Sequence, residues 1–180
     1  MRKTMARTLV LTVVGKDRPG LVEALADLIT QYEGSWDESR MACLSGHFAG
    51  VVQVHLPESR ADSLICALPA LLDSGLSVSV VSSDSVLADV DCRKSWWLDL
   101  VSQDRPGIVR DISSRLASLG VSVQDLRTVI EDAPMSGERL FRAEAELVPP
   151  AGADFEQIRA ALEQLADDMM IDLKLNNEKE

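Results

Sequence analysis

Short apolar runs alternate with longer amphipathic stretches along this 180-residue chain. Residues 9–14 form the first apolar run, which has strand length, ends at a polar turn and predicts a buried strand. A helix is predicted to begin at Pro19, because the residue before a proline avoids the helical region and proline suits the first helical position. The apolar positions that follow have the spacing of one helix face. They are Leu21, Val22, Leu25, Leu28, Ile29 and Tyr32.

The following stretch predicts three more strands. A second strand is expected at about residues 36–43, followed by a turn at Gly46 and a third strand. The apolar run at residues 76–81 predicts the last strand. A second helix is expected between the third and fourth strands, so the predicted order is β-α-β-β-α-β.

Local signals mark this second helix. It follows a turn at Pro57, and Ser59 and Asp62 have a spacing that resembles a capping box. Pro69 interrupts the helical pattern, and we expect a kink or an early end there.

The whole pattern occurs twice. Asp17-Arg18-Pro19-Gly20-Leu21-Val22 returns as Asp104-Arg105-Pro106-Gly107-Ile108-Val109, at an offset of 87 residues. The simplest explanation is two copies of a unit of about 85 residues. In the second copy a helix is predicted to begin at Pro106. Strands are predicted there at residues 96–101, 122–130 and 170–175, with an alternating strand around 141–147.

The duplicated order predicts an α+β fold with two ferredoxin-like βαββαβ domains. Each would be an antiparallel four-stranded sheet with two helices on one face. The expected divisions are a first domain at residues 1–83, a polar linker at 84–94, a second domain at 95–175 and a polar C-terminal tail at 176–180.

The charge excludes some partners. Lys and Arg number 18 against 29 Asp and Glu, a formal net charge of −11, and both halves are net acidic. Direct nucleic-acid binding requires a basic surface, so neither nucleic acid nor an anionic membrane is an expected partner. No stretch approaches the roughly 20 apolar residues that span a bilayer, and we expect a cytoplasmic protein.

Catalytic and metal-binding patterns are lacking. Cys43, Cys66 and Cys92 have no Cys-x-x-Cys spacing, so we expect reduced thiols packed as small hydrophobic residues. The two histidines, His47 and His55, have no counterparts in the second copy and are expected on the surface. We therefore predict no enzyme activity, no catalytic residue, no metal site and no cofactor.

What repeats is the turn between the first strand and the first helix. Its glycine has no Cβ, so a ligand could approach the backbone closely. The helix N-terminus offers unpaired N–H groups to a carboxylate, and Asp17 or Asp104 could accept hydrogen bonds from an ammonium group. A small amino acid matches both halves of this arrangement. The alternative is that the tetrapeptide only starts a helix well.

An Asp-Arg-Pro-Gly turn followed by Leu-Val or Ile-Val inside a βαββαβ unit resembles the ACT domain, a regulatory module that often binds amino acids. Two such units, with Trp36-Asp37-Glu38-Ser39-Arg40-Met41 and Gly46-His47-Phe48-Ala49-Gly50, resemble the glycine-cleavage-system transcriptional repressor family. The resemblance implies a repressor that senses an amino acid, glycine or similar. It also implies action through a protein partner, such as an activator that itself holds the DNA.

The resemblance also implies the site, near a neighbouring ACT domain. The expected ligand-binding residues are Asp17, Arg18, Pro19, Gly20, Leu21, Asp104, Arg105, Pro106, Gly107 and Ile108. The secondary candidates are Ser35, Glu38, Arg40, Ser122, Asp125 and Arg127. Glu38 and Arg40 could instead be an exposed ion pair. Amino-acid-binding ACT domains often have Asn where Ser35 and Ser122 stand, so binding could be lost or changed.

Two other functions stay open. The protein could modulate a metabolic enzyme in trans, or it could be a structural pairing module without a ligand. Exposed sheet edges also make a homo-oligomer an expected partner.

Overall fold

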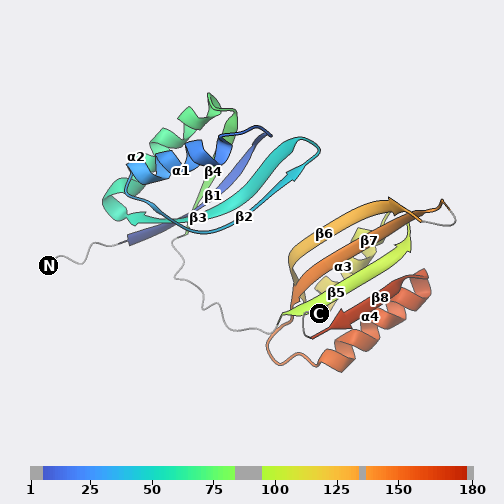
Figure 1. The fold of residues 1–180 in the computed structure, drawn as a ribbon. Helices are drawn as coiled ribbons and strands as arrows, with labels where there is room; N and C mark the ends of the chain where they lie inside the picture. The colour runs from blue at the N-terminus through green and yellow to red at the C-terminus, as the bar shows by residue number, and fades with distance from the viewer. Residues whose placement is uncertain (1–5, 84–94, 134–136, 178–180) are drawn as a thin grey trace. The chain divides into compact units, whose positions relative to one another are not determined.

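The computed structural model describes residues 6–83, 95–133 and 137–177. Contacts within the chain divide it into two units, Met1–Ala88 and Asp89–Glu180. Each unit contains one four-stranded sheet and two α-helices (Figure 1). The predicted linker at 84–94 and the last three residues of the predicted tail lie outside the described residues.

The first unit has the predicted element order, and its sheet has the strand order β2-β3-β1-β4 with antiparallel neighbours. Its elements are β1 (Ala6–Lys16), α1 (Leu21–Gln31), β2 (Ser35–Leu44), β3 (His47–Pro57), α2 (Glu58–Ala67), the 3₁₀ helix η1 (Leu68–Leu72) and β4 (Leu76–Ser83).

The second unit repeats this order, and its sheet runs β6-β7-β5-β8. Its elements are β5 (Trp96–Gln103), α3 (Ile108–Ser118), β6 (Ser122–Asp132), β7 (Arg139–Val148), α4 (Phe155–Met169) and β8 (Asp172–Asn176). Even an irregularity is repeated, because the pairing register shifts between Trp36 and Glu38 in β2 and between Val123 and Asp125 in β6. The predicted α+β fold of two ferredoxin-like units is confirmed.

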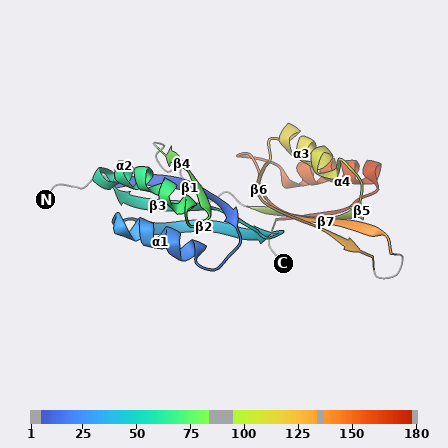
Figure 2. The same ribbon diagram turned by 90° about the horizontal axis from the view of Figure 1, so that it is seen from above.

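Both helices of a unit cover the same sheet face. In β1 the alternate residues Leu9, Leu11 and Val13 are fully buried and pack with Leu25 of α1 and Leu64 of α2. In β5 the corresponding alternation buries Trp96, Leu98 and Leu100. Figure 2 shows α3 and α4 on one side of the second sheet. Apolar burial on one face therefore holds each unit together.

Both first helices begin two residues later than predicted. α1 starts at Leu21 and α3 at Ile108, because Gly20 and Gly107 have φ values of 91° and 97°. This left-handed conformation is open to glycine and cannot continue a right-handed helix. Pro19 and Pro106 therefore belong to the turn.

The apolar stripe is also narrower than predicted. Val22 and Val109 are 46% and 43% exposed, whereas the residues one turn further along the helix, Leu25 and Ile112, are buried. Both valines occupy the same repeat position beside the turn.

The capping box prediction is wrong. α2 begins at Glu58 after Pro57, with no side-chain cap, so Ser59 lies inside the helix. The effect of Pro69 is confirmed, since α2 ends at Ala67 and the chain continues as η1. The strand predicted at 170–175 begins at Asp172, because Met170 takes a left-handed conformation with φ 54°.

One close backbone contact distinguishes the two units. A Cβ on Gly15 would lie only 2.4 Å from the carbonyl oxygen of Gly75, so β1 and the start of β4 meet backbone to backbone. Ser102 is the repeat counterpart of Gly15. Pairing between β5 and β8 reaches only Val101 and Asp172, one residue pair short of the Gly15–Leu76 pair in the first unit.

Candidate functional site

The strand–helix turn has the same backbone arrangement in both units. The Asp17 amide donates to the carbonyl of Gly46, and the Asp104 amide donates to the carbonyl of Arg139, at 2.9 and 2.8 Å. Each turn is therefore fixed against the segment that leads into the third strand of its own unit. Gly20 and Gly107 then set the start of α1 and α3.

Neither helix N-terminus is capped by a side chain. A Cβ built on Gly20 would meet no atom within 4 Å, so the space beside the start of α1 is open. The first amides of an α-helix have no partner inside the helix and carry partial positive charge. The two turns can therefore offer backbone donors to a small anionic group such as a carboxylate.

The side chains of the first turn point to two neighbouring segments. Arg18 donates from Nη2 to the carbonyl oxygen of Ser74, beside Gly75, and so joins the turn to the segment before β4. A hydrogen bond to the Asp17 carboxylate raises the pKa of the Cys43 thiol above its usual value. The Asp17 carboxylate is exposed, and the thiol is its neighbour from the end of β2.

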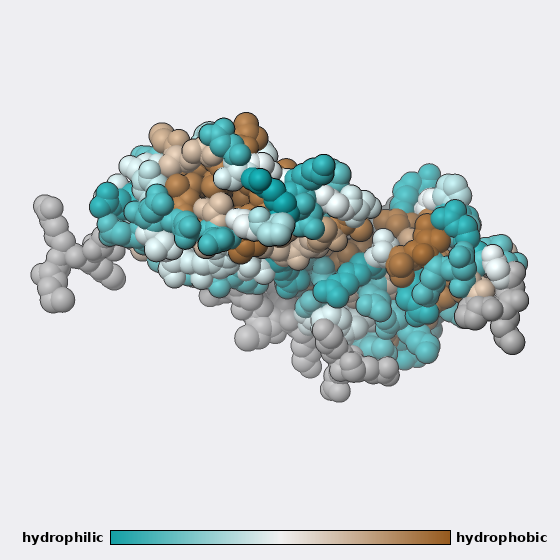
Figure 3. Space-filling view, turned by 45° about the horizontal axis from the view of Figure 1, so that its top comes forward, coloured by the Kyte–Doolittle hydropathy of each residue, from teal (hydrophilic) through white to brown (hydrophobic). Residues whose placement is uncertain are grey.

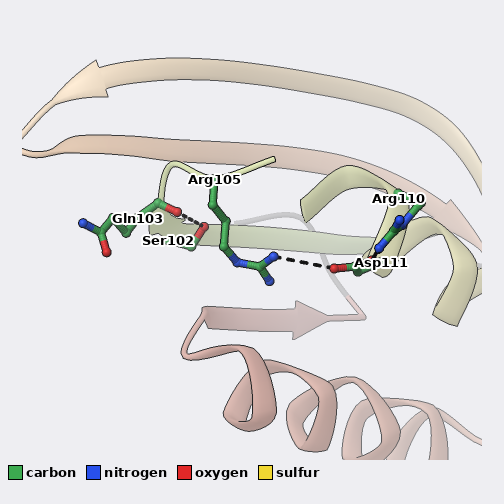
Figure 4. Close-up of polar contacts among 5 residues, drawn as sticks. All are labelled: Ser102, Gln103, Arg105, Arg110 and Asp111. Atoms are coloured by element: carbon green, nitrogen blue, oxygen red, sulfur yellow. Dashed lines mark hydrogen bonds and ion pairs between the residues drawn. The ribbon is translucent and has the colours of Figure 1, made fainter. Parts of the chain in front are cut away.

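The second turn carries more charge. Asp111 in the first turn of α3 lies 2.8 Å from Arg110 and 3.7 Å from Arg105 (Figure 4). The hydrogen bond from Arg110 and the charges of both guanidinium groups lower the pKa of Asp111. Asp104 lies 3.6 Å from Arg139. A ligand at this turn would meet three cations, Arg105, Arg110 and Arg139, and two carboxylates.

The secondary candidates do not join the turns within a unit. Glu38 and Arg40 line a shallow hollow of about 210 Å³ with Val10, Val51 and Gln53, on the sheet face opposite the helices. In the second unit Arg127 lies 3.7 Å from Asp125, an ion pair at the positions that correspond to Arg40 and Glu38.

Ser35 and Ser122 begin β2 and β6 at the end of the sheet remote from the turns. Ser35 pairs with His55, whereas Lys16, which precedes the first turn, pairs with His47. Within each unit these serines therefore stand apart from the helix N-terminus.

The sequence reasoning missed several neighbours of the turns, notably Cys43, Arg110 and Asp111. Cys43 and Cys66 are exposed, which makes the prediction of packed thiols wrong for both, while Cys92 lies outside the described residues. The sequence did contain a signal for Asp111. The repeat offset aligns Asp111 with Ala24, so only the second copy has a charge at this position.

Other features of the described residues carry no site chemistry. His47 and His55 are exposed, as predicted. Residues 6–83, 95–133 and 137–177 contain no group of three His, Cys, Asp or Glu side chains able to hold a metal ion. Over the same ranges, no helix has the length and apolar character needed to cross a membrane.

Comparison with known proteins agrees with this architecture. Residues 7–80 match the model of the ACT domain. A crystal structure of a protein of unknown function from Galdieria sulphuraria is 27% identical, with a TM-score of 0.77, and the match covers 96% of this chain and 98% of that one. A protein described as a "putative glycine cleavage system transcriptional repressor" is 19% identical, with a TM-score of 0.72, covering 96% and 97%. No curated protein matches the chain.

Residues 7–80 are thus an ACT domain, and the second unit repeats its topology and its turn. The chain thus contains two units of the same topology, of which the first matches the ACT domain. Over nearly its whole length it resembles in fold the repressor-type structure named above.

Proposed function

We propose that this protein is a non-enzymatic, cytoplasmic regulator of transcription that senses a small amino acid at its strand–helix turns. Its regulatory class would be that of the glycine cleavage system repressor. The observation that carries the proposal is the uncapped helix N-terminus behind a left-handed glycine and an aspartate, present in both units.

The chemistry of the turn suits an amino acid. The ligand carboxylate accepts hydrogen bonds from the first amides of α1 or α3, where the helix dipole favours negative charge. The ligand ammonium group lies near Asp17 in the first unit or Asp104 in the second. Glycine needs no room for a side chain and is the first candidate effector.

Regulation would pass through a protein partner. The net charge of −11 opposes direct binding to DNA phosphates, so a partner that holds the DNA is required. The fold shared with the repressor-type structure supports this role.

Ligand binding is tested by thermal unfolding of the full chain with each of the twenty amino acids. A ligand at 100 times its dissociation constant adds about 2.7 kcal/mol to the free energy of unfolding. Stabilisation by glycine or another small amino acid is the expected result. If no amino acid stabilises the chain, the proposal of an amino-acid sensor is contradicted and the interpretation that remains is a structural pairing module without a ligand.

The partner is tested by affinity purification of the tagged full chain with and without the stabilising amino acid. We expect a DNA-binding protein whose recovery changes with the ligand. Recovery of a metabolic enzyme in its place would contradict transcriptional regulation and support modulation of that enzyme in trans.

A further inference from the structure

An open cleft of about 430 Å³ lies at one end of the second sheet, where β5 ends and β8 begins. Polar residues from three elements line it. They are Ser102 and Gln103 at the end of β5, Asp167 near the end of α4, and Asp172 at the start of β8. Among the described residues, the lining of the cleft contains these two carboxylates and no Lys or Arg.

Ser102 explains why this end of the sheet is open. In the first unit Gly15 pairs with Leu76, and a Cβ on Gly15 would lie 2.4 Å from the carbonyl oxygen of Gly75. Ser102 has a Cβ at the corresponding position, and the pairing between β5 and β8 stops one residue pair short of the pairing in the first unit. The two strands therefore separate earlier, and the cleft lies where they separate.

In the first unit a guanidinium group occupies the corresponding place. Arg18 donates to the carbonyl oxygen of Ser74, and its Nε atom lies 3.5 Å from the position of a Cβ on Gly75. The counterpart of Gly75 is Met170, which lines the cleft. Both residues are left-handed, with φ values of 73° and 54°, and both lie two residues before the first strand pair that the two units share.

The corresponding arginine of the second unit is held elsewhere. Arg105 extends to Asp111 at 3.7 Å, as Figure 4 shows. The first unit has Ala24 in place of Asp111, and alanine cannot compete for Arg18. The second unit thus keeps the place for a guanidinium group while its own arginine pairs with α3.

The end of α4 makes the cleft electronegative. The last carbonyl groups of an α-helix lack partners within the helix and carry partial negative charge. Asp167 and Asp168 lie in the last turn of α4, which contains no basic residue. Carboxylates at this end of a helix are unfavourable unless a cation neutralises them. Hydrophilic residues cover much of the surface visible in Figure 3, and the net charge of −11 attracts cations from a distance.

We propose that this cleft binds the guanidinium group of an arginine presented by a protein partner. The group donates to the carbonyl oxygens at the end of α4, as Arg18 donates to the Ser74 carbonyl in the first unit. The carboxylates of Asp167 and Asp172 neutralise its charge. Arginine fits better than lysine, because its planar group carries several donors that reach acceptors on different elements at once.

Ser102 supplies a further acceptor. The residue is 7% exposed, and its hydroxyl donates to the carbonyl of Gln103 at 3.3 Å. This hydrogen bond uses the proton of the hydroxyl and leaves the acceptor capacity of the oxygen for the guanidinium group.

NMR titration of the full chain with N-acetyl-arginine N-methylamide tests the proposal. The blocked ends remove the free ammonium and carboxylate groups, so an amino-acid site at the turns does not contribute. We expect saturable shifts of the backbone amides of Ser102, Gln103 and Ile171. The same compound built from citrulline, which has a similar shape and no charge, should bind about fivefold or more weakly, because charged donors form stronger hydrogen bonds.

The decisive variant is Asp167→Asn, which should weaken binding of the arginine compound about two- to fivefold. Its matched control is Asp168→Asn. This variant makes the same change of charge in the same turn of α4, at a residue that does not line the cleft. It should leave the binding unchanged.

A second pair of variants tests the role of Asp111. Asp111→Ala copies Ala24 of the first unit and releases Arg105, which should then enter the cleft and weaken binding of the arginine compound. Asp111→Ala combined with Arg105→Ala should restore the binding. If Asp111→Ala fails to fold, the comparison of Asp167→Asn with Asp168→Asn still decides whether the cleft is the site.

Four results would overturn the proposal. They are no saturable shift at the cleft, equal binding of the citrulline compound, equal loss in Asp167→Asn and Asp168→Asn, and shifts of the same amides with Ca²⁺ but not with the arginine compound. The last result would assign the cleft to a metal ion. Weak binding that persists in the double variant would exclude competition by Arg105. Because the probe has blocked ends, all of these results leave the proposed amino-acid sensing untouched.

Discussion

The two strand–helix turns share a backbone and differ in their charges. In the first, Arg18 is held by the Ser74 carbonyl and the start of α1 is open. In the second, Asp111 gathers Arg105 and Arg110, because it stands where the first turn has Ala24. Duplication has therefore kept the part of the site made by amide groups and changed the part made by side chains. Under the proposed function, the two turns should therefore bind one class of ligand with different affinities.

The packing between the helices and the sheet also differs between the two units. Trp36 and Met41 of β2 pack against the first core, whereas β6 adds no residue to the second core, which has an apolar cavity of about 30 Å³ under α3. Truncation of a buried side chain should therefore lower the free energy of unfolding by different amounts at equivalent positions of the two units.

The largest effect is expected for Leu25→Ala compared with Ile112→Ala. Leu25 is fully buried, so truncation should cost about 3–5 kcal/mol of unfolding free energy. Ile112 already borders the cavity and should cost about 2–3 kcal/mol. Chemical denaturation followed by hydrogen exchange in each unit measures both values. A larger cost at Ile112 would contradict the tighter packing of the first unit.

Gly20→Val and Gly107→Val should each cost about 1–3 kcal/mol, because a β-branched residue is strained at φ values of 91° and 97°. Each should also remove the amino-acid stabilisation of its own turn. The controls are Gly20→Asn and Gly107→Asn, since asparagine tolerates this conformation. Thermal unfolding with and without ligand distinguishes strain from loss of the site. A ligand response that survives both valine variants would exclude the turns as the site.

A smaller difference is expected between Arg18→Ala and Arg105→Ala. Arg18 donates to a backbone carbonyl, and its loss should lower the unfolding free energy by about 1 kcal/mol. Arg105 makes an exposed ion pair, and its loss should cost about 0.5 kcal/mol or less. Denaturation at 0.1 M and 1 M salt provides the check, since only the Arg105 effect should vanish at high salt.

The smallest effect concerns pH. The folded-state pKa of Asp111 is lowered, so its stabilising contribution is complete above the unfolded-state pKa of about 3.9 and is lost as the pH falls through the folded-state value. Asp111→Asn should be less stable than the unaltered chain at pH 7, and this difference should shrink below about pH 4. The first unit has Ala24 at the corresponding position and therefore no carboxylate that would titrate in the same way. A constant difference across the acid range would contradict the ion pairs at the second turn.

Much of this architecture could be predicted because it follows from local patterns that occur twice in the sequence. The recurrence of Asp-Arg-Pro-Gly and the alternation at Phe141, Ala143 and Ala145 give the element order without tertiary information. The start of α1 was misplaced, because proline favours a first helical position, whereas the left-handed Gly20 is a property of the folded turn. The contacts of Cys43 with Asp17 join residues from separate elements and could not be derived from spacing. The cavity was also beyond prediction, because it depends on β6 side chains that do not reach the core.

The close approach of Gly15 to the Gly75 carbonyl has a consequence for the history of this chain. The serine of the second copy has no room at position 15, because its Cβ would overlap a backbone oxygen. Copying the serine of the later repeat into position 15 of the earlier one would therefore force Gly75 away from β1 and destabilise the first unit. The two halves of the gene are thus constrained to keep different residues at this position.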